Sequence, residues 1–310
     1  MTSAIAIVGA TATGKSQLAV ELAIRLGGEI VNADAFQVYR GLDIGTAKPD
    51  SGARAAVAHH LIDILEPTET FSAGRFARRA AAAIADIVAR GRVAIVAGGT
   101  GFYVRALAEG LAPLPTVPPE LRERLAARCA REGAPALHVE LASVDPESAA
   151  RIAPRDRHRV LRALEVWLAS GETLSSWHRR APATPNAPTL RKIGLTLPRA
   201  VLYDRIESRV ASMLERGWLD EIRGLLAAGV PPAAPAFRAI GYRSMIEYLS
   251  HGRDLESATR EAVVATRRYA KRQETWFRRD RDIEWLEARD RERALEAALR
   301  HAGARSGESA

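Results

Sequence analysis

The segment "GATATGKS" (Gly9–Ser16) constrains the fold more than any other stretch of this sequence. It fits the phosphate-loop pattern G-x-x-x-x-G-K-[ST], in which glycines and backbone amides surround a phosphate group. The apolar run "AIAIV" (4–8) precedes it, and leucines four residues apart follow it at Leu18, Leu22 and Leu26. A strand, a tight turn and an amphipathic helix in this order are what the motif requires. The sequence therefore predicts a phosphate-binding α/β unit, with a purely structural glycine turn as the alternative.

Each part of this loop has an expected chemical task. Gly14 lets the backbone approach a phosphate closely, and the loop amides and the helix start offer positive charge to it. Lys15 neutralises further phosphate oxygens, and the Ser16 hydroxyl is expected to face a magnesium ion, the predicted cofactor. The predicted phosphate-binding residues are Gly9, Ala10, Thr11, Ala12, Thr13, Gly14, Lys15 and Ser16.

Strand and helix patterns alternate over the amino-terminal third of the chain. Apolar runs of strand length lie at 4–8, 29–32 and 92–97, and helical patterns follow the first run and span 73–90. Alternation of this kind favours a parallel sheet. The predicted fold class is α/β, a P-loop NTPase-like parallel sheet flanked by helices, with an inserted all-helical domain.

Two proline-rich segments divide the chain. "APLPTVPP" (112–119) and "APATPNAP" (181–188) are typical of linkers, and the sequence between them is almost wholly helical in pattern. A strand-like segment resumes at 191–197, and one long amphipathic helix is expected from about 199 to 228. The alternative is two domains in sequence. We predict a catalytic core of residues 1–112 and 188–288, an inserted helical domain at 113–187 and a charged, flexible tail at 289–310.

The charge balance suits a polyanionic partner. The net charge is +8, from 45 lysines and arginines against 37 acidic residues. The basic residues form two clusters, and few acids lie near either one. A solvated helix face is the ordinary explanation of a basic cluster, but the scarcity of acids leads us to expect contact with a nucleic acid. The clusters are Arg151, Arg155, Arg157, Arg159 and Arg162, and Arg267, Arg268, Lys271, Arg272, Arg278 and Arg279.

Composition also bears on the setting of the protein. Hydrophobic residues make up 47% of the chain, but no apolar run reaches the ~20 residues that span a bilayer. No basic leader precedes the first apolar stretch, so a cytoplasmic protein is expected. The single cysteine, Cys129, lies in a helical pattern and is expected to be a buried structural thiol.

A carboxylate follows the second predicted strand, in "IVNADAFQVYRGLDIGTAKP" (30–49). Open α/β sheets bind ligands at the carboxyl ends of their strands, so Asp34 is a candidate site residue. The alternative for Asp34 is a helix N-cap or a turn. Asp43, Thr46 and Lys48 lie in a polar loop, where positioning roles and turn formation both remain open.

Two further segments weigh against common alternatives. His59 and His60 suggest a metal site, but adjacent histidines rarely share a ligand geometry, so structural roles are expected. The apolar strand ending at Ala97 is followed by Gly98-Gly99-Thr100, where phosphate-loop NTPases often carry an acid that manages magnesium and water. This departure argues against ordinary ATP hydrolysis. The glycines permit close approach of a ligand or another backbone, and Thr100 supplies a neutral hydroxyl, with a structural turn as the alternative.

Seven segments in this order carry a resemblance to a known family: "GATATGKS", "NADAFQVYRGLDIGTAKP", "HHLIDILEPTETFSAGRF", "AGGTGFYVRAL", "RDRHRVLRALEV", "FRAIGYR" and "ATRRYAKRQETWFR". Together they resemble the tRNA dimethylallyltransferases, also called tRNA isopentenyltransferases, from Ile5 to Arg279. The resemblance implies transfer of the dimethylallyl group from dimethylallyl diphosphate to a tRNA, with release of diphosphate. The acceptor would be the exocyclic amine of the adenine 3′-adjacent to the anticodon.

The resemblance also implies roles for individual residues. The phosphate loop would hold the diphosphate, together with Arg209, for which a surface position is the alternative. Asp34 would be the general base, Lys15 would stabilise the departing diphosphate, and Thr100 would lie at the reacting centre.

tRNA contacts are implied on the core and on the inserted domain, which would clamp the anticodon stem. The Tyr242 ring would offer a stacking face, although Ile240 and Tyr242 fit a buried core equally well. The implied tRNA-binding residues are Asp34, Ala35, Phe36, Gln37, Thr100, Arg122, His158, Arg159, Val160, Leu161, Arg162, Arg238, Ala239, Ile240, Gly241, Tyr242 and Arg243.

The expected partners are therefore the tRNA anticodon stem-loop and dimethylallyl diphosphate, with no membrane, for a monomeric enzyme. A nucleoside or nucleotide kinase is one alternative, since it would share the loop, the sheet and a helical insertion. A non-enzymatic RNA-binding protein with a relic phosphate loop is the other. Incubation with labelled dimethylallyl diphosphate, Mg2+ and unmodified tRNA separates all three.

Overall fold

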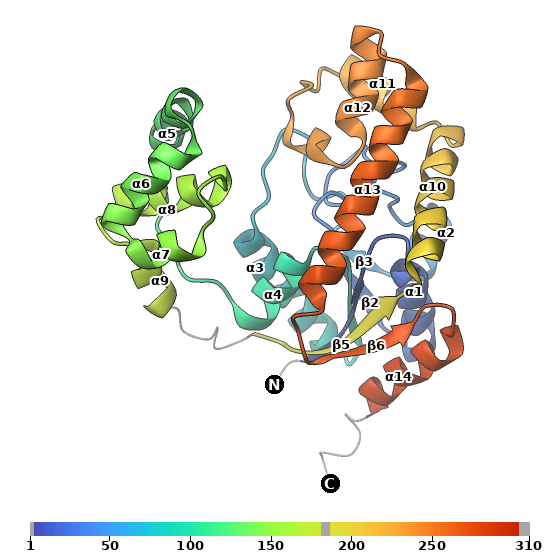
Figure 1. The fold of residues 1–310 in the computed structure, drawn as a ribbon. Coiled ribbons are helices and arrows are strands. Elements are labelled where there is room, and N and C mark those ends of the chain that lie inside the picture. Colours follow the sequence, from blue (N-terminus) through green and yellow to red (C-terminus); the bar gives the residue numbers. More distant parts are fainter. Residues whose placement is uncertain (1–2, 181–186, 304–310) are drawn as a thin grey trace. The chain divides into compact units, whose positions relative to one another are not determined.

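The computed structural model describes residues 3–180 and 187–303, which form two compact units. One unit comprises Met1–Glu109 and Asn186–Ala310, and the other comprises Gly110–Pro185 (Figure 1). These divisions lie close to the expected bounds of the insertion. Both ends of the chain supply strands to one sheet, so the alternative of two domains in sequence is wrong. None of the described helices is long and apolar enough to cross a membrane.

The first unit is built on a six-stranded sheet of order β3-β2-β4-β1-β5-β6, in which every neighbouring pair is parallel. The sheet agrees with the predicted α/β class, and its central strands are buried on both faces, as parallel sheets require. The carboxyl ends of all six strands meet at one edge. The strands are β1 (Ser3–Gly9), β2 (Glu29–Asn32), β3 (His59–His60), β4 (Ala94–Ala97), β5 (Thr189–Thr196) and β6 (Ile283–Glu287).

Alternate residues of β1 face the two helical layers. Ala4, Ala6 and Val8 pack with α3 (Ala73–Ala89), α4 (Gly101–Glu109) and the end of α13 (Leu255–Phe277). Ile5 and Ile7 face the opposite layer, formed by α1 (Lys15–Leu26) and α14 (Arg291–Gly303). This period of two fixes which residues are covered from each side.

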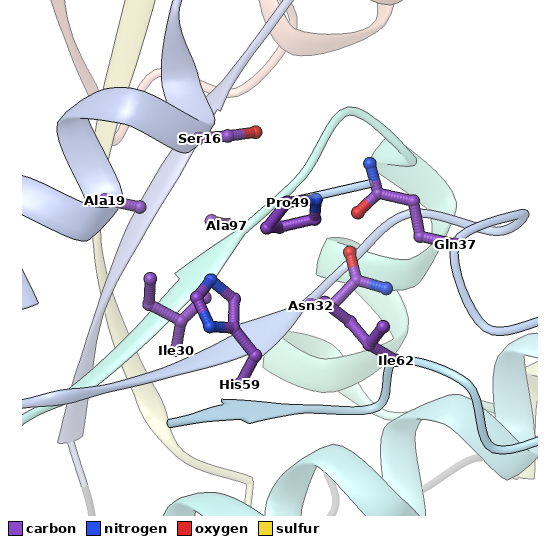
Figure 2. A pocket seen from close by; sticks show the side chains of 9 residues that line it. All are labelled: Ser16, Ala19, Ile30, Asn32, Gln37, Pro49, His59, Ile62 and Ala97. Carbon is purple, nitrogen blue, oxygen red and sulfur yellow. The ribbon is translucent and has the colours of Figure 1, made fainter. Parts of the chain in front are cut away.

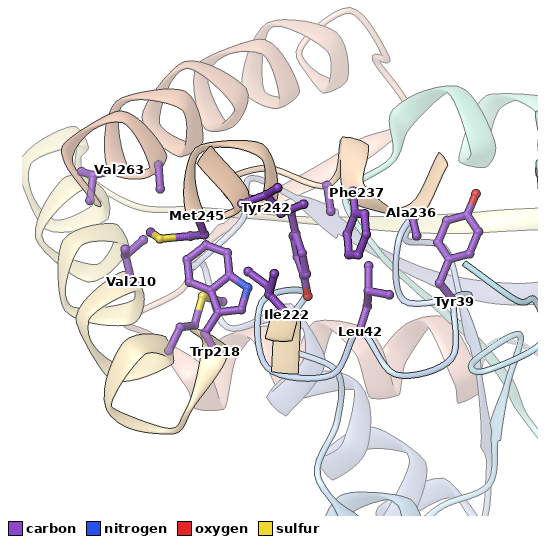
Figure 3. Packing of buried hydrophobic residues seen from close by; sticks show 14 of the residues in the cluster. Tyr39, Leu42, Val210, Trp218, Ile222, Ala236, Phe237, Tyr242, Met245 and Val263 are labelled. Atoms are coloured by element: carbon purple, nitrogen blue, oxygen red, sulfur yellow. The ribbon is translucent and has the colours of Figure 1, made fainter. Parts of the chain in front are cut away.

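A third cluster packs α10 (Arg199–Glu215), α11 (Trp218–Ala227) and α12 (Tyr242–His251) with α13 and the loop after β2 (Figure 3). The side chains of Trp218 and Tyr242 are buried at its centre, with ring centroids 5.5 Å apart. Leu42 and Tyr39 from the loop join them. The remaining elements of this unit are α2 (Ser51–Ala56) and the short 3-10 helix η1 (Pro235–Arg238).

The inserted unit is all helical within the part of the chain that the structure describes. Its core contains Leu125, Leu137, Leu141, Leu164 and the expected buried thiol of Cys129. Its helices are α5 (Pro119–Glu132), α6 (Ala134–Val144), α7 (Pro146–Arg151), α8 (Arg157–Ser170) and α9 (Leu174–Arg180).

Two predictions of local structure are wrong. The helix expected over 199–228 is two helices, because Gly217 adopts φ +92° between α10 and α11. The flexible tail expected from 289 instead contains α14, since Ala294, Leu295 and Ala298 form an apolar stripe that packs with α1. Residues 304–310 of that prediction lie outside the described residues.

Candidate active site

Backbone conformation and close packing shape the phosphate loop between β1 and α1. Gly9 has φ +132°, and a Cβ there would lie 2.5 Å from the carbonyl oxygen of Leu195, so only glycine fits. Gly14, with φ +94°, precedes α1. Ala12 adopts φ +63°, a left-handed conformation that costs a residue with a side chain about 1–2 kcal/mol. The loop is therefore pre-shaped at a helix N-terminus, where phosphates bind well.

Two cations lie at this loop with little compensation. The Lys15 side chain is buried, and its Nζ donates a hydrogen bond to the carbonyl of Ala10. Burial and the neighbouring Arg209 guanidinium lower the pKa of Lys15 to about 7, while the Asp34 carboxylate opposes this shift. Burial likewise lowers the pKa of Arg209, which makes no hydrogen bond or ion pair within the described residues. The Arg209 charge is thus available to a multiply charged anion.

Asp34 begins a tight turn directly after β2. Its Oδ1 accepts hydrogen bonds from the amides of Phe36 (2.8 Å) and Gln37 (3.3 Å), and its own amide donates to Asn32 Oδ1 (3.1 Å). The alternative of a helix N-cap is wrong, because no helix begins at this turn. The Oδ2 atom makes no hydrogen bond among residues 3–180 and 187–303. One carboxylate oxygen therefore shapes the turn and the other can accept a proton.

Thr100 is joined to the Asp34 turn by two hydrogen bonds. Its Oγ1 accepts from the Ala35 amide (3.1 Å), and its amide donates to the Ala33 carbonyl (3.3 Å). Gly98 permits this approach, since a Cβ there would lie 2.3 Å from the Ala33 backbone. The strand β4 ends at Ala97 without an acid. A hydroxyl thus lies beside the Asp34 turn, at the end of the strand where an NTPase often carries an acid.

Sequence reasoning missed two residues of α13 that complete this site. Gln273 is buried, its Oε1 accepts from the Thr11 amide (2.8 Å), and its Nε2 donates to the Gly99 carbonyl (2.8 Å). Tyr269 lies one turn earlier on the same helix. Burial and the nearby Asp34 charge raise the pKa of Tyr269 to about 12, so the phenol is neutral. The only sequence signal was their place in the motif "ATRRYAKRQETWFR".

A pocket opens beside the phosphate loop (Figure 2). Its lining is mainly neutral: the Ser16 hydroxyl, the Asn32 and Gln37 amides and the His59 ring face it among aliphatic side chains. No group of three or more His, Cys, Asp or Glu side chains in the described chain is arranged to hold a metal ion. The lining residues are Ser16, Ala19, Ile30, Asn32, Gln37, Pro49, His59, Ile62 and Ala97.

The two histidines have structural partners. The His59 Nδ1 lies 2.8 Å from the Val57 carbonyl, and burial lowers the pKa of His59. The His60 Nε2 lies 2.7 Å from Glu29 Oε2, and Glu29 also binds Arg90. This agrees with the structural roles expected from their adjacency.

The segment "FRAIGYR" divides between the surface and the core. Arg238 and Arg243 are exposed, and the Arg243 Nε lies 3.1 Å from Glu247. The Tyr242 ring is fully buried, so the expectation that it offers a stacking face to RNA is wrong. Ala239 is buried as well, whereas Ile240 and Gly241 are half-buried.

The remaining candidates lie in the helical unit. His158 and Arg159 are exposed on the first turn of α8, and Val160 faces the core with no exposed surface. The half-buried Arg162 and the exposed Arg122 both pair with Glu165, at 3.3 and 3.8 Å. Leu161 is half-buried. The exposed side chains of Arg122 and Arg159 are therefore accessible to a polyanion, whereas the buried Val160 side chain is not.

Comparison with known proteins identifies the family. The model of the family described as "IPP transferase" matches residues 37–280. The chain belongs to this family. A tRNA dimethylallyltransferase of Methylococcus capsulatus is 50% identical over 91% of each chain. The crystal structure of a tRNA isopentenylpyrophosphate transferase from Bacillus halodurans is 39% identical, with a TM-score of 0.72 over 98% of this chain and 96% of that one.

A second solved structure extends the likeness beyond bacteria. A eukaryotic dimethylallyltransferase described as acting on tRNA is 28% identical, with a TM-score of 0.81 over 99% of this chain and 79% of that one. The resemblance drawn from the seven sequence segments is therefore confirmed, and so is the predicted P-loop-like fold. Relatives with the same family name match nearly the full length of the chain, which favours the prenyltransferase interpretation over the kinase.

Proposed function

We propose that this IPP transferase family member transfers the dimethylallyl group of dimethylallyl diphosphate to the exocyclic amine of the adenine 3′-adjacent to the tRNA anticodon. One observation carries the proposal. The Asp34 carboxylate lies close enough to Lys15 and Arg209 at the phosphate loop to raise the pKa of both, and one of its oxygens makes no hydrogen bond within the described residues. A site for an anionic leaving group thus adjoins a base for the incoming nucleophile.

The cations serve the departing diphosphate. Negative charge grows on that group as the bond to the allylic carbon breaks, and prearranged positive charge stabilises it most at that moment. The buried Lys15 amine has a pKa of about 7, and a bound diphosphate would favour its charged form. Arg209 keeps its charge without a hydrogen-bonding partner among the described residues, so little reorganisation precedes binding.

The incoming amine must also lose a proton. An aromatic amine is a weak nucleophile, and it loses a proton when its nitrogen bonds to the allylic carbon. Asp34 Oδ2 accepts that proton, while Oδ1 keeps its bonds to the amides of Phe36 and Gln37. The Thr100 hydroxyl, which accepts a hydrogen bond from the Ala35 amide of the same turn, would orient the target adenine. This assigns each carboxylate oxygen a separate task.

The residues fit a magnesium ion that arrives with the diphosphate. The exposed Ser16 hydroxyl at the start of α1 would hold it, and no acid cluster in the described chain offers an alternative ligand set. Magnesium binds through few protein ligands, waters and substrate phosphates, and it would supply further neutralisation of the leaving group.

We propose that the tRNA is bound by both units. The target adenine must leave its stack to reach Asp34, and anticodon loops are single-stranded regions that permit this. On the core, the exposed cations Arg238 and Arg243 would bind backbone phosphates of the tRNA. The turn of Ala35 and Phe36 adjoins Asp34 and would contact the target adenine. On the helical unit, the first turn of α8 and Arg122 would contact the anticodon stem. We further propose that the enzyme is a cytoplasmic monomer.

Transfer to RNA tests the proposal directly. Labelled dimethylallyl diphosphate, Mg2+ and an unmodified anticodon stem-loop should give labelled RNA, and the same RNA with guanine at the target position should not. Labelling of neither RNA while the stem-loop still binds would favour a non-enzymatic RNA-binding protein. Phosphorylation of a small acceptor from ATP would instead support the kinase.

A further inference from the structure

The loop that follows the Asp34 turn is held by a carboxylate from a distant helix. Glu221 on α11 accepts hydrogen bonds from three successive backbone amides, those of Asp43 (2.6 Å), Ile44 (2.6 Å) and Gly45 (3.3 Å). The hydroxyl of Tyr242 on α12 donates a fourth bond to Glu221 Oε1 (2.6 Å). Successive amides form a concave anion-binding site, and here the protein's own carboxylate fills it. A charged acceptor makes each of these bonds stronger than a neutral one.

The packing around this carboxylate leaves little freedom. A Cβ at Gly45 would lie 2.0 Å from Trp218 Nε1 and 2.6 Å from the Tyr242 hydroxyl, so the loop backbone lies directly against these side chains. Both rings are buried in the cluster of Figure 3. This explains why a tyrosine that does not face solvent belongs to the motif "FRAIGYR".

A second group of contacts joins this loop to Asp34. The Gln37 Nε2 donates to the carbonyls of Thr46 and Ala47, both at 3.1 Å. The backbone amide of the same Gln37 donates to Asp34 Oδ1 (3.3 Å), beside the bond from Phe36. One residue therefore binds the anchored loop with its side chain and the Asp34 carboxylate with its backbone.

The two ends of the loop are also pinned together. The buried Lys48 Nζ lies 2.5 Å from Asp43 Oδ1 and 2.6 Å from Asp63 Oδ1, and it donates to the Tyr39 carbonyl (2.7 Å). Because this cation has several partners, the loop holds its shape as a unit. A displacement of the backbone at residues 43–45, where Glu221 binds, would then also displace the carbonyls of Thr46 and Ala47 that Gln37 binds.

We propose that Glu221, braced by Tyr242, is a positioning residue for transfer: it fixes the loop of residues 43–47 and, through Gln37, the orientation of the Asp34 carboxylate. Glu221 does so through the loop and not by touching the substrate. The inference rests on the proposed function, in which Asp34 accepts the proton. The same contacts would also serve a loop anchor that only stabilises the fold, so the test must separate the two roles.

Glu221→Gln is the informative substitution, because it keeps the shape of the side chain. Glutamine has one acceptor oxygen, and its NH2 group would face amide or hydroxyl donors that now lack a partner. We expect the single-turnover transfer rate to fall about 10- to 100-fold, since small misplacement of a catalytic group costs up to that much. Affinity for dimethylallyl diphosphate, set at the phosphate loop, should change less than threefold.

Asp220→Asn is the matched control. Asp220 precedes Glu221 on α11, carries the same charge, and is exposed in an ion pair with Arg223. Its substitution should leave the transfer rate within twofold of the wild type. Tyr242→Phe, which keeps the buried ring and removes one donor to Glu221, should give a smaller loss than Glu221→Gln.

A double-mutant cycle with Asp34→Asn distinguishes positioning from stability. If Glu221 acts through Asp34, Glu221→Gln should cost almost nothing further once Asp34 can no longer accept a proton. If the double variant loses transfer rate by the product of the two single-variant factors, the proposal is overturned. It is also overturned if Glu221→Gln lowers the transfer rate and the diphosphate affinity by equal factors and lowers the Tm.

Amide hydrogen exchange tests the connection without any activity. Glu221→Gln should accelerate exchange of the amides of residues 43–45, and also of Phe36 and Gln37. Acceleration confined to 43–45 would refute transmission to the Asp34 turn. Absence of transfer by the wild-type enzyme would instead refute the proposed function, and the exchange measurement would still decide whether the loop and the turn are coupled.

Discussion

Replacement of Asp34 by asparagine separates proton acceptance from every other task of this side chain. An asparagine Oδ1 can still accept from the Phe36 and Gln37 amides, so the turn should persist. The atom that replaces Oδ2 becomes an NH2 group, which cannot take a proton at neutral pH. Loss of a general base costs about 10²–10⁴ in rate. At about 1.4 kcal/mol for each factor of ten, this raises the barrier by about 3–5.5 kcal/mol.

The electrostatics of the site add a second expected effect. Burial and Arg209 lower the pKa of Lys15 and the Asp34 charge raises it, and the net value is about 7. Asp34→Asn should therefore lower the pKa of Lys15 below 7, and a larger fraction of the free enzyme would carry a neutral amine at neutral pH. Diphosphate affinity of the variant should fall as the pH rises from 6 to 8, more steeply than in the wild type.

The assay is single-turnover transfer, in which slow product release does not hide the chemical step. Melting temperature and the affinities for tRNA and dimethylallyl diphosphate are measured on the same variant. Asp86→Asn is a suitable control, since it removes an exposed carboxylate that pairs with Arg90 on the surface of the core unit. A near-normal rate for Asp34→Asn would refute the mechanism. A comparable loss of stability and of both affinities would show that Asp34 is only a turn residue.

Three further outcomes are expected. Gln273→Met should weaken diphosphate affinity about tenfold, because Gln273 ties the phosphate loop to Gly99, whereas Thr275→Val on the same helix should be neutral. Glu29→Gln should reduce the free energy of unfolding by about 2 kcal/mol at pH 7 in urea titrations. Hydrogen bonds from Arg90 lower the pKa of Glu29 to about 2, so its stabilisation is present above the usual value of 4.5 and is lost as the pH falls towards 2, where the variant should match the wild type. Alanine at Arg159 and Arg162 should flatten the log-log salt dependence of tRNA affinity by about 0.7–0.9 per lost phosphate contact.

Local patterns were enough to predict the elements that build the phosphate site. The strand expected at 29–32 is β2, and the helix expected at 73–90 is α3, because a short strand in the sheet interior gives an apolar run and a helix buried on one side gives an apolar period. Motif spacing then placed Lys15 and Asp34 at the same edge of the sheet. In the structure Thr100 is hydrogen-bonded to the Asp34 turn, and Lys15 lies within electrostatic reach of Asp34 and Arg209; the roles that the family resemblance implies for these residues stay predictions.

The failures share one physical cause, which is that tertiary contacts override local patterns. The apolar spacing runs on through Gly217, but its left-handed backbone ends one helix and starts another. The segment after 289 is highly charged, yet its few apolar side chains lie on one face and are covered by α1. Neither a helix break at a glycine nor a partner helix at the other end of the chain is visible in a local window.

The residues that complete the site show the same limit more sharply. Gln273 binds Thr11 across 262 positions of sequence, and Glu221 binds Asp43 across 178. Their importance follows from what their polar atoms satisfy: backbone amides and carbonyls of loops that carry Lys15, Thr100 and Asp34. Loops need such partners because their backbone groups lack the ladders of sheets and helices. A motif far from the phosphate loop can therefore be explained by the backbone it holds, as buried Tyr242 and its partner Glu221 hold the loop of residues 43–47.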